Sequence, residues 1–305
     1  MTSAVNTAPN LASQFVNGVL SIKPLANLAK QQARNMMIKR AEKIGVPWRQ
    51  RVEELRKHDW DSELAEVQNT QLTYPDYYLC SFHAYETGNL SWDAALEVEV
   101  AAYAVHAKIW PGTGSQGDAK LRQTYHDIVK EQLPIQPRDI LDLGCSVGMS
   151  TFALQALYPS ANLTGVDLSP YFLSVAQYNS RQRNMQITWK HAAAEATGLP
   201  DASFDLVSTC LMFHELPQEA SRHIFQEARR LLRPGGYLTI MDMNPKSEVF
   251  AAMPPYILTL LKSTEPYLDD YFTLNIEQTL VDTGFHPPRI TSNSPRHRTI
   301  VAQAK

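Results

Sequence analysis

The stretch Asp139-Ile-Leu-Asp-Leu-Gly-Cys-Ser-Val-Gly148 decides the fold of this chain. Its first part, Ile140 to Leu143, is a short and mostly apolar run that is typical of a buried strand, and glycines at 144 and 148 then open a loop. Residues 149–158 follow with apolar side chains at helical spacing. A strand, a glycine turn and a helix form the entry unit of a nucleotide-binding α/β domain, because glycine lets the backbone turn sharply and a ligand lie against it.

The composition is that of a globular protein. The chain has 305 residues, of which 44% are hydrophobic, and a formal net charge of -3. This length suits two domains, or one large domain with an extension. The charge balance provides no basic stripe, so we expect no nucleic-acid partner. No apolar run reaches the roughly 18 residues of a membrane span, and we therefore expect a soluble protein. Its expected localisation is cytoplasmic, with peripheral membrane contact as a further possibility.

The three cysteines, Cys80, Cys145 and Cys210, lie far apart and form no CxxC pair. This pattern favours a reducing compartment and argues against a disulfide framework or a zinc site, so no metal is expected.

The N-terminal part is predicted to be helical and separate from the rest. Residues 1–41 contain no Asp or Glu, but they carry basic residues and apolar residues at roughly helical spacing. This segment is a helical arm packed on the body, a membrane-surface helix attracted by acidic lipid, or a removable targeting peptide. Peripheral membrane contact through residues 11–40 is therefore a hypothesis. The clearest linker is Pro111 to Asp118, so we predict a helical arm and cap region over 1–118 and a second domain over 119–305.

In the second domain, apolar runs alternate with helical segments. The predicted strands are 140–143, 163–167, 187–190, 204–208, 237–241, 288–291 and 299–304. This alternation predicts a parallel sheet with helices on both faces. The short gap between the last two strands favours an antiparallel pair.

Ligands of such sheets lie beyond the carboxyl ends of the strands. Asp167 ends its predicted strand about 20 residues after the glycine loop, where a carboxylate accepts hydrogen bonds from ribose hydroxyls. The loop lacks the G-x-G-x-x-G spacing of dinucleotide sites. It does match G-x-S-x-G, a hydrolase elbow with Ser146 as nucleophile and His214, His286 or His297 as partner. That interpretation leaves Asp142 and Asp167 without a role.

Four motifs, in order and at fitting distances, resemble the class I S-adenosylmethionine-dependent methyltransferases, and the resemblance runs from about Leu121 to the C-terminus. The motifs are Ile140 to Gly148, Gly165 to Pro170, Leu199 to Val207 and Leu231 to Leu238. The resemblance implies S-adenosylmethionine as cofactor. It also implies a Rossmann-like methyltransferase fold, which has a mostly parallel seven-stranded sheet with an antiparallel C-terminal strand. An N-terminal helical domain is expected in addition.

The resemblance also implies roles for the matched residues in cofactor binding. Asp142 would help hold the methionine amino group, and the loop backbone would lie against the methionine part. Asp167 would bind both ribose hydroxyls, and Leu168 would flank the adenine. The complete set is Asp142, Gly144, Cys145, Ser146, Gly148, Asp167, Leu168, Ala193, Ala194, Glu195, Cys210 and Phe213.

Within this set, Ala193, Ala194 and Glu195 would face the adenine edge, and Cys210 and Phe213 would lie near the sulfonium. Two positions depart from the family pattern: Ser146 replaces the usual middle glycine of the loop, and Ala193 replaces a common aspartate.

The acceptor is harder to predict. His214 follows the fourth strand and is a candidate general base, because the ordinary pKa of histidine lies near neutrality; the alternative is a structural loop histidine. Aromatic residues between Tyr74 and Tyr85 belong to the core or line a pocket. The sequence looks most like small-molecule methyltransferases, including those that act on quinones and other lipid-like acceptors. We expect a small acceptor and keep a membrane-dissolved one as a hypothesis. A non-catalytic S-adenosylmethionine-binding protein and a protein or RNA methyltransferase are the alternatives.

Overall fold

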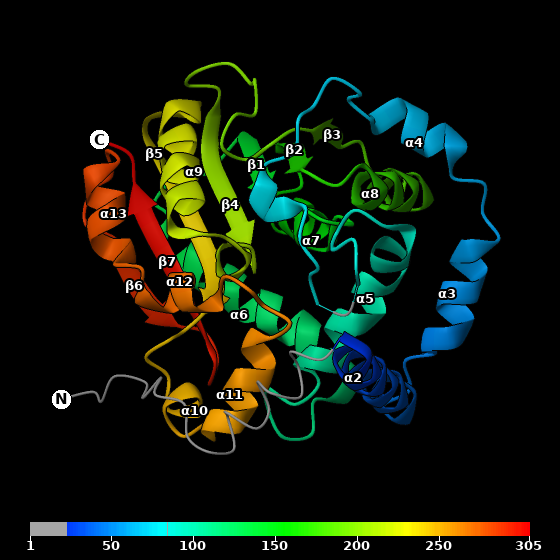
Figure 1. Cartoon of the computed structure of the whole chain (residues 1–305). Coiled ribbons are helices and arrows are strands. Elements are labelled where there is room, and N and C mark those ends of the chain that lie inside the picture. The colour runs from blue at the N-terminus through cyan, green and yellow to red at the C-terminus, as the bar shows by residue number, and fades with distance from the viewer. Residues whose placement is uncertain (1–22, 84) are drawn as a thin grey trace.

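The computed structural model describes residues 23–83 and 85–305 (Figure 1). Residues 11–22 of the hypothetical membrane segment therefore lie outside the described residues.

One seven-stranded sheet runs through the molecule, in the order β3-β2-β1-β4-β5-β7-β6. The strands from β1 to β5 pair in parallel, whereas β7 is antiparallel to both β5 and β6. The strands are β1 Asp139–Leu143, β2 Asn162–Asp167, β3 Thr188–His191, β4 Phe204–Cys210, β5 Leu232–Met243, β6 Arg289–Ser292 and β7 His297–Gln303. The predicted fold class, including the antiparallel C-terminal strand, is confirmed.

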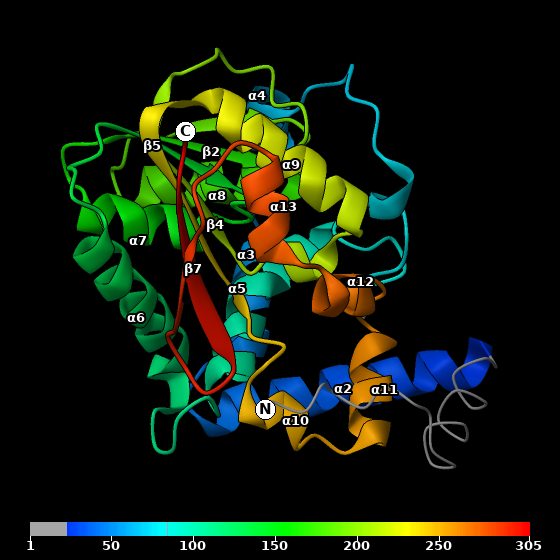
Figure 2. The ribbon, with the colours of Figure 1, turned by 90° about the vertical axis from the view of Figure 1, so that its left-hand side faces the viewer.

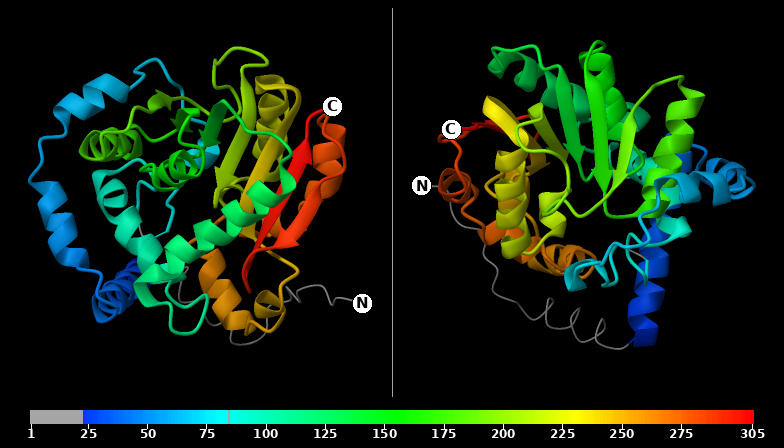
Figure 3. Two further views of the ribbon diagram at one scale, coloured as in Figure 1. Left: turned by 180° about the vertical axis from the view of Figure 1, so that it is seen from behind. Right: turned by 90° about the horizontal axis from the view of Figure 1, so that it is seen from above.

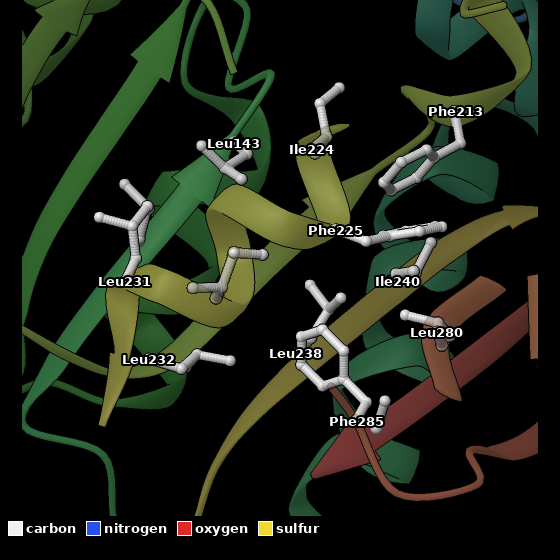
Figure 4. Close-up of a cluster of buried hydrophobic side chains, with 14 of the residues drawn as sticks. Leu143, Phe213, Ile224, Phe225, Leu231, Leu232, Leu238, Ile240, Leu280 and Phe285 are labelled. Carbon is white, nitrogen blue, oxygen red and sulfur yellow. The ribbon is translucent and has the colours of Figure 1, made fainter. Parts of the chain in front are cut away.

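Helices cover both faces of this sheet (Figure 3). They are α6 Gly117–Gln132, α7 Met149–Leu157, α8 Pro170–Gln182, α9 Gln218–Leu231 and α13 Ile276–Asp282. Alternate residues of one strand face opposite cores: Ile140 of β1 packs with α6 and α7, and Leu141 and Leu143 pack with α9 and α13. Figure 4 shows part of the second core, in which Phe213 and Phe225 lie among leucines and isoleucines.

The start of β5 differs from the prediction. The predicted strand covers 237–241, but β5 begins at Leu232 and includes the turn at Pro234 to Gly236. The β4–β5 pairing shifts register between Phe204 and Leu206, and Gly235 adopts a left-handed φ of 78°. The bend therefore interrupts the ladder without ending the strand.

The described N-terminal helices form a cap on the sheet. They are α2 Lys23–Lys43, α3 Trp48–Arg56, α4 Asp61–Val67 and α5 Trp92–His106, with the 3-10 turn η1 Asp76–Tyr78 before α5. Ser91 caps α5 as its position predicts, because its hydroxyl accepts a hydrogen bond from the Ala94 amide at 3.2 Å. The cap core also contains Val147 of the glycine loop and Phe172 of α8. The cap thus packs directly against the loop that opens the α/β unit.

A second group of helices follows β5: α10 Glu248–Ala251, α11 Pro255–Lys262 and α12 Leu268–Thr273. In Figures 1 and 2, α10 and α11 lie at the same end of the molecule as α2. Among the described helices, none has the length and apolar character needed to cross a membrane.

The core in Figure 4 yields a stability prediction. Phe225 is fully buried, and its ring centroid lies 4.8 Å from that of Phe213. Phe225→Ala should lower the free energy of unfolding by about 3–5 kcal/mol, because it removes buried area and leaves a cavity. Guanidinium unfolding followed by circular dichroism measures this loss. His223→Ala on the exposed side of the same helix is the control, and equal midpoints for the two variants would contradict the prediction.

Candidate functional site

A cavity of about 650 Å³ lies between the carboxyl ends of the parallel strands, the cap and the α10–α11 segment. Most of the predicted site residues line it: Gly144, Cys145, Ser146, Asp167, Leu168, Ala194, Glu195, Cys210 and His214. The fold therefore brings predicted site residues from four separate loops to one cavity.

Asp142, Gly148, Ala193 and Phe213 do not line the cavity, and for Phe213 the structure corrects the predicted position. The Phe213 side chain is fully buried in the core against Phe225, whereas Met212 lines the cavity. The cause is local: Leu211 adopts a left-handed φ of 58°, so the chain turns before it enters η3 Phe213–Glu215. The left-handed residue changes the direction of the side chains that follow it.

The glycine loop is fixed to the end of β2 through Asp167. One oxygen of this carboxylate accepts a hydrogen bond from the Ser146 amide and the other from the Ser169 amide, both at 2.8 Å. Burial raises the pKa of Asp167 to about 6, although these backbone donors favour its ionised form. Ser146 has a left-handed φ of 50°, and its buried hydroxyl has no hydrogen-bond partner. The Ser146 hydroxyl can therefore form a hydrogen bond with a ligand at this point.

Asp142 lies behind the loop. It is buried, and one of its oxygens accepts a hydrogen bond from the Thr151 hydroxyl at 2.6 Å, while the other has no partner. Burial raises the pKa of Asp142 to about 7, against the effects of Thr151 and Arg122.

Arg122 of α6 is a cavity residue that the sequence analysis missed. Its Nη1 atom lies 2.6 Å from the Ser150 hydroxyl and 3.3 Å from the Cys210 sulfur, and its Nε atom donates to Asp118 at 2.9 Å. In the sequence, Asp118 and Arg122 have the spacing of an ordinary surface pair on a helix, so no signal marked this arginine.

The aromatic segment before α5 contributes to the wall on the β2–β3 side. Tyr77 and Tyr78 line the cavity, and the Tyr77 hydroxyl donates a hydrogen bond to Glu195. The Asn69 amide donates to Nδ1 of His191 at 2.9 Å, and the Tyr74 hydroxyl lies 3.3 Å from Nε2 of the same ring. These bonds hold the segment 69–78 across the ends of the strands.

His214 forms a buried pair with Asp242, at the end of β5. Its Nδ1 atom lies 2.8 Å from Asp242, which also accepts hydrogen bonds from the amides of Phe213 and Met243. Burial disfavours the imidazolium, but the charge and hydrogen bond of Asp242 outweigh it and raise the pKa of His214 to about 10. This environment thus moves the pKa of His214 away from the near-neutral value that made it a candidate general base.

Three more polar residues face the same part of the cavity: His83, Glu215 and Glu265. The His83 Nε2 atom lies 3.0 Å from Glu265 and 3.9 Å from Glu215. The backbone amide of His83 also donates to the Thr264 carbonyl at 2.9 Å, so this contact joins the cap to the α11–α12 connection. Glu265 and Asp242 could not be recognised from the sequence, since only the tertiary fold brings them close to His83 and His214.

The rest of the cavity wall is mostly apolar. Two faces contribute to it, one from α2 and α5 and one from β5, α10 and α11. The main apolar side chains are Met37, Val98, Ala101, Val105, Met243, Phe250, Ile257 and Leu261. Within residues 23–83 and 85–305, no group of three or more His, Cys, Asp or Glu side chains could hold a metal ion.

Comparison with known proteins relates part of this chain to methyltransferases. A family model described as a methyltransferase domain matches residues 140–236. A ubiquinone biosynthesis O-methyltransferase of Psychrobacter arcticus is 30% identical over 161 residues, which cover 50% of this chain and 61% of that relative. Its counterpart from Paraburkholderia xenovorans is 31% identical over 135 residues, which cover 43% of this chain and 56% of that relative. The match thus spans less than two thirds of the length of these relatives.

Solved structures with low sequence identity share the fold. A putative O-methyltransferase of Nostoc punctiforme superposes with a TM-score of 0.52 at 18% identity, covering 80% of this chain and 67% of its own. Phosphoethanolamine N-methyltransferase 2 of Haemonchus contortus, solved in complex with S-adenosyl-L-methionine, has a TM-score of 0.53 at 16% identity and covers 72% of this chain and 61% of its own.

The His214–Asp242 pair should make stability depend on pH. The folded-state pKa of His214, about 10, is raised above its ordinary value of 6.5, so the pair stabilises the fold fully below pH 6.5. That contribution is lost as the pH rises from 6.5 toward 10. The difference in unfolding free energy between wild type and Asp242→Asn should therefore be larger at pH 6 than at pH 10 in guanidinium titrations. His223→Gln, at an exposed histidine of α9, is the control. A difference that grows with pH would contradict the assignment.

Proposed function

Because the α/β part of this chain belongs to the class I S-adenosylmethionine-dependent methyltransferases, we propose that the protein transfers the methyl group of S-adenosylmethionine to a small lipophilic acceptor. The observation that carries the proposal is the single cavity, which joins the polar glycine loop and Asp167 to an apolar chamber. When bound, S-adenosylmethionine supplies a methyl group already activated on a sulfonium. The protein then has to align the two reactants and exclude water.

The residues of the glycine loop fit the donor. Asp167 binds the ribose hydroxyls, because its two oxygens are held at the loop end by backbone donors. The unpartnered Ser146 hydroxyl and the backbone of Gly144 and Cys145, which line the cavity, face the methionine part. Gly144 has a left-handed φ of 69°, which favours glycine, and a side chain there would also meet that of Met212.

The adenine lies at the ends of β2 and β3 in this proposal. Leu168 and Ala194 flank it, and the backbone at Ala193 and Ala194 meets its edge. Glu195 is already bonded by Tyr77 and keeps one buried oxygen without a partner, which can accept a hydrogen bond from the adenine amino group.

The methionine end lies near α6 and α7. We assign the carboxylate of the methionine part to Arg122, because its guanidinium lies in the cavity wall and its Nη2 atom has only long contacts, 3.4 Å to Asp118 and 3.9 Å to Met149. Asp142 helps to hold the amino group from behind the loop, and Cys210 lies beside the sulfonium.

The acceptor occupies the apolar chamber, with its reactive group toward His214. A membrane-dissolved acceptor is supported by α11, because Ile257 both lines the cavity and is 39% exposed, and Tyr256 and Leu260 are 45% and 41% exposed on the same helix. An acceptor in a lipid layer would thus meet apolar side chains that continue into the chamber.

Calorimetric titration with S-adenosylmethionine, S-adenosylhomocysteine and NAD tests the donor. We expect binding of both adenosyl compounds and none of NAD. Asp167→Ala should weaken their binding about 10- to 100-fold, since hydrogen bonds to a charged group contribute about 1.5–3 kcal/mol and about 1.4 kcal/mol corresponds to tenfold. The matched control is Asp139→Ala at the opposite end of β1, where the carboxylate pairs with Arg233. Tight binding of NAD would overturn the proposal, and methyl transfer from labelled donor to extracted lipids would separate an enzyme from a binding protein.

Vesicle flotation tests the membrane contact. Lys39 and Lys43 are exposed on α2, and a lysine near an anionic surface contributes about 1 kcal/mol. The full chain should float with vesicles that contain phosphatidylglycerol and much less with neutral phosphatidylcholine. Lys39→Glu with Lys43→Glu should weaken the binding on the order of 30-fold, whereas Lys57→Glu on α3 should not. Equal, negligible flotation of all proteins would exclude the contact.

A further inference from the structure

We propose that Glu215 accepts the proton that the methyl acceptor loses, and that His214 lies beside it as the cation facing the oxygen that loses this proton. The inference rests on the proposed methyl transfer and assigns its acid–base chemistry to a residue that the sequence analysis did not single out.

The position of Glu215 suits this role. It follows His214 directly in η3, and both side chains line the cavity. Its Oε2 atom accepts a hydrogen bond from the Asn89 amide group at 3.2 Å. Its Oε1 atom is 3.9 Å from the His83 Nε2 atom, which is beyond hydrogen-bond distance. One carboxylate oxygen is therefore oriented by a neighbour, and the other is available to an acceptor.

His214 is paired with Asp242 and is therefore unsuited to accept the proton. Its Nδ1 atom is bound to Asp242, whose pKa is lowered despite burial, mainly by His214 itself, and the backbone amides of Phe213, His214 and Met243 also donate to this carboxylate. Only Nε2 is left for the cavity. Because the pKa of His214 is raised to about 10, the doubly protonated ring is favoured at neutral pH, and Nε2–H is then the donor left for the cavity. A ring in this state cannot take a proton, but it stabilises an oxygen that becomes negative.

Glu215 has the complementary property. Burial raises its pKa to about 7, while the charges of His83 and His214 oppose the rise. The groups that face it are His214 from η3, His83 and Asn89 from the cap loop, Glu265 from the α11–α12 connection, and Tyr78 from η1. A base is most effective when its pKa lies near the working pH, so Glu215 can take up a proton and later return it to water.

The step balances with an acidic hydroxyl as acceptor. The O–H bond of the acceptor breaks, and its proton passes to Oε1 of Glu215. The oxygen uses an electron pair to form the new bond to the methyl carbon. The bond from that carbon to sulfur breaks with its electrons left on sulfur, which cancels the positive charge there. A phenol or enol suits this base, because the pKa of a phenol, about 10, is within reach of a carboxylate of raised pKa.

The pH dependence of methyl transfer to a phenol tests the assignment. In the wild type, kcat should rise as Glu215 ionises near pH 7 and fall as His214 loses its proton toward pH 10. Glu215→Gln should lower kcat by about 10²- to 10⁴-fold and abolish the limb near pH 7. Glu215→Asp should keep that limb, because a carboxylate remains. Glu265→Gln, which removes a neighbouring carboxylate paired with His83, should keep the limb but shift it to lower pH, because a charge that raises the pKa of Glu215 is lost. A limb near pH 7 that survives in Glu215→Gln would overturn the inference.

A second measurement needs no methyl donor. Bound 4-nitrophenol reports its own ionisation by absorbance, so the pKa of the bound probe can be followed in each variant. His214→Gln should raise this pKa, since a cation near the phenol oxygen is lost. Glu215→Gln should lower it, since a nearby negative charge is lost. If neither variant moves the pKa of the bound probe, the two side chains do not face the acceptor oxygen and the inference fails.

These outcomes separate the inference from the proposed function. Failure of the wild type to bind S-adenosylhomocysteine or to transfer methyl groups would remove the proposed function, and the inference with it. Methyl transfer by the wild type, together with an unchanged pH profile in Glu215→Gln, would overturn the inference alone. Unchanged binding of S-adenosylhomocysteine by the variant shows that it is folded.

Discussion

The site depends on one carboxylate. Asp167 ends β2 and accepts hydrogen bonds from the amides of Ser146 and Ser169, so it fixes the glycine loop after β1 and the entry to α8 relative to each other. The loop in turn contacts the cap, because Val147 packs into the cap core. A buried carboxylate needs such donors, since without them its desolvation would be costly. The same hydrogen bonds hold the oxygens of Asp167 as acceptors at the position where the ribose of the proposed methyl donor binds.

Much of this arrangement follows from local sequence. Runs such as Ile140 to Leu143 and Leu163 to Asp167 are strands because they are apolar, short and followed by turn residues, and the structure extends each by only one residue. The regular alternation with helices then fixes which strand ends meet. The sequence therefore sufficed to predict that Gly144, Asp167 and His214 lie at one cavity, because parallel strands bring their carboxyl ends to the same edge of the sheet.

Other features could not be predicted, because they depend on contacts between distant segments. The left-handed Leu211 sends Phe213 into the core and Met212 to the cavity, a rotation that the residue types do not reveal. The raised pKa of His214 requires Asp242, which only the pairing of β4 with β5 brings close. The domain boundary at residue 118 is still a prediction, since the cap and the α/β part share a packed core.

The segment 69–78 has a consequence for the rate at which the proposed cofactor can exchange. It lies across the β2–β3 side of the cavity and is held there by contacts of Asn69 and Tyr74 with His191 and of Tyr77 with Glu195. In the proposed function, exchange of the used S-adenosyl cofactor for a new one at that end would require these few contacts to break, while the sheet stays intact. Loop opening of this kind is often slower than bond making. In the proposed function, the donor would thus exchange on the β2–β3 side and the acceptor would enter near α11, so the two paths would lie at different parts of the cavity.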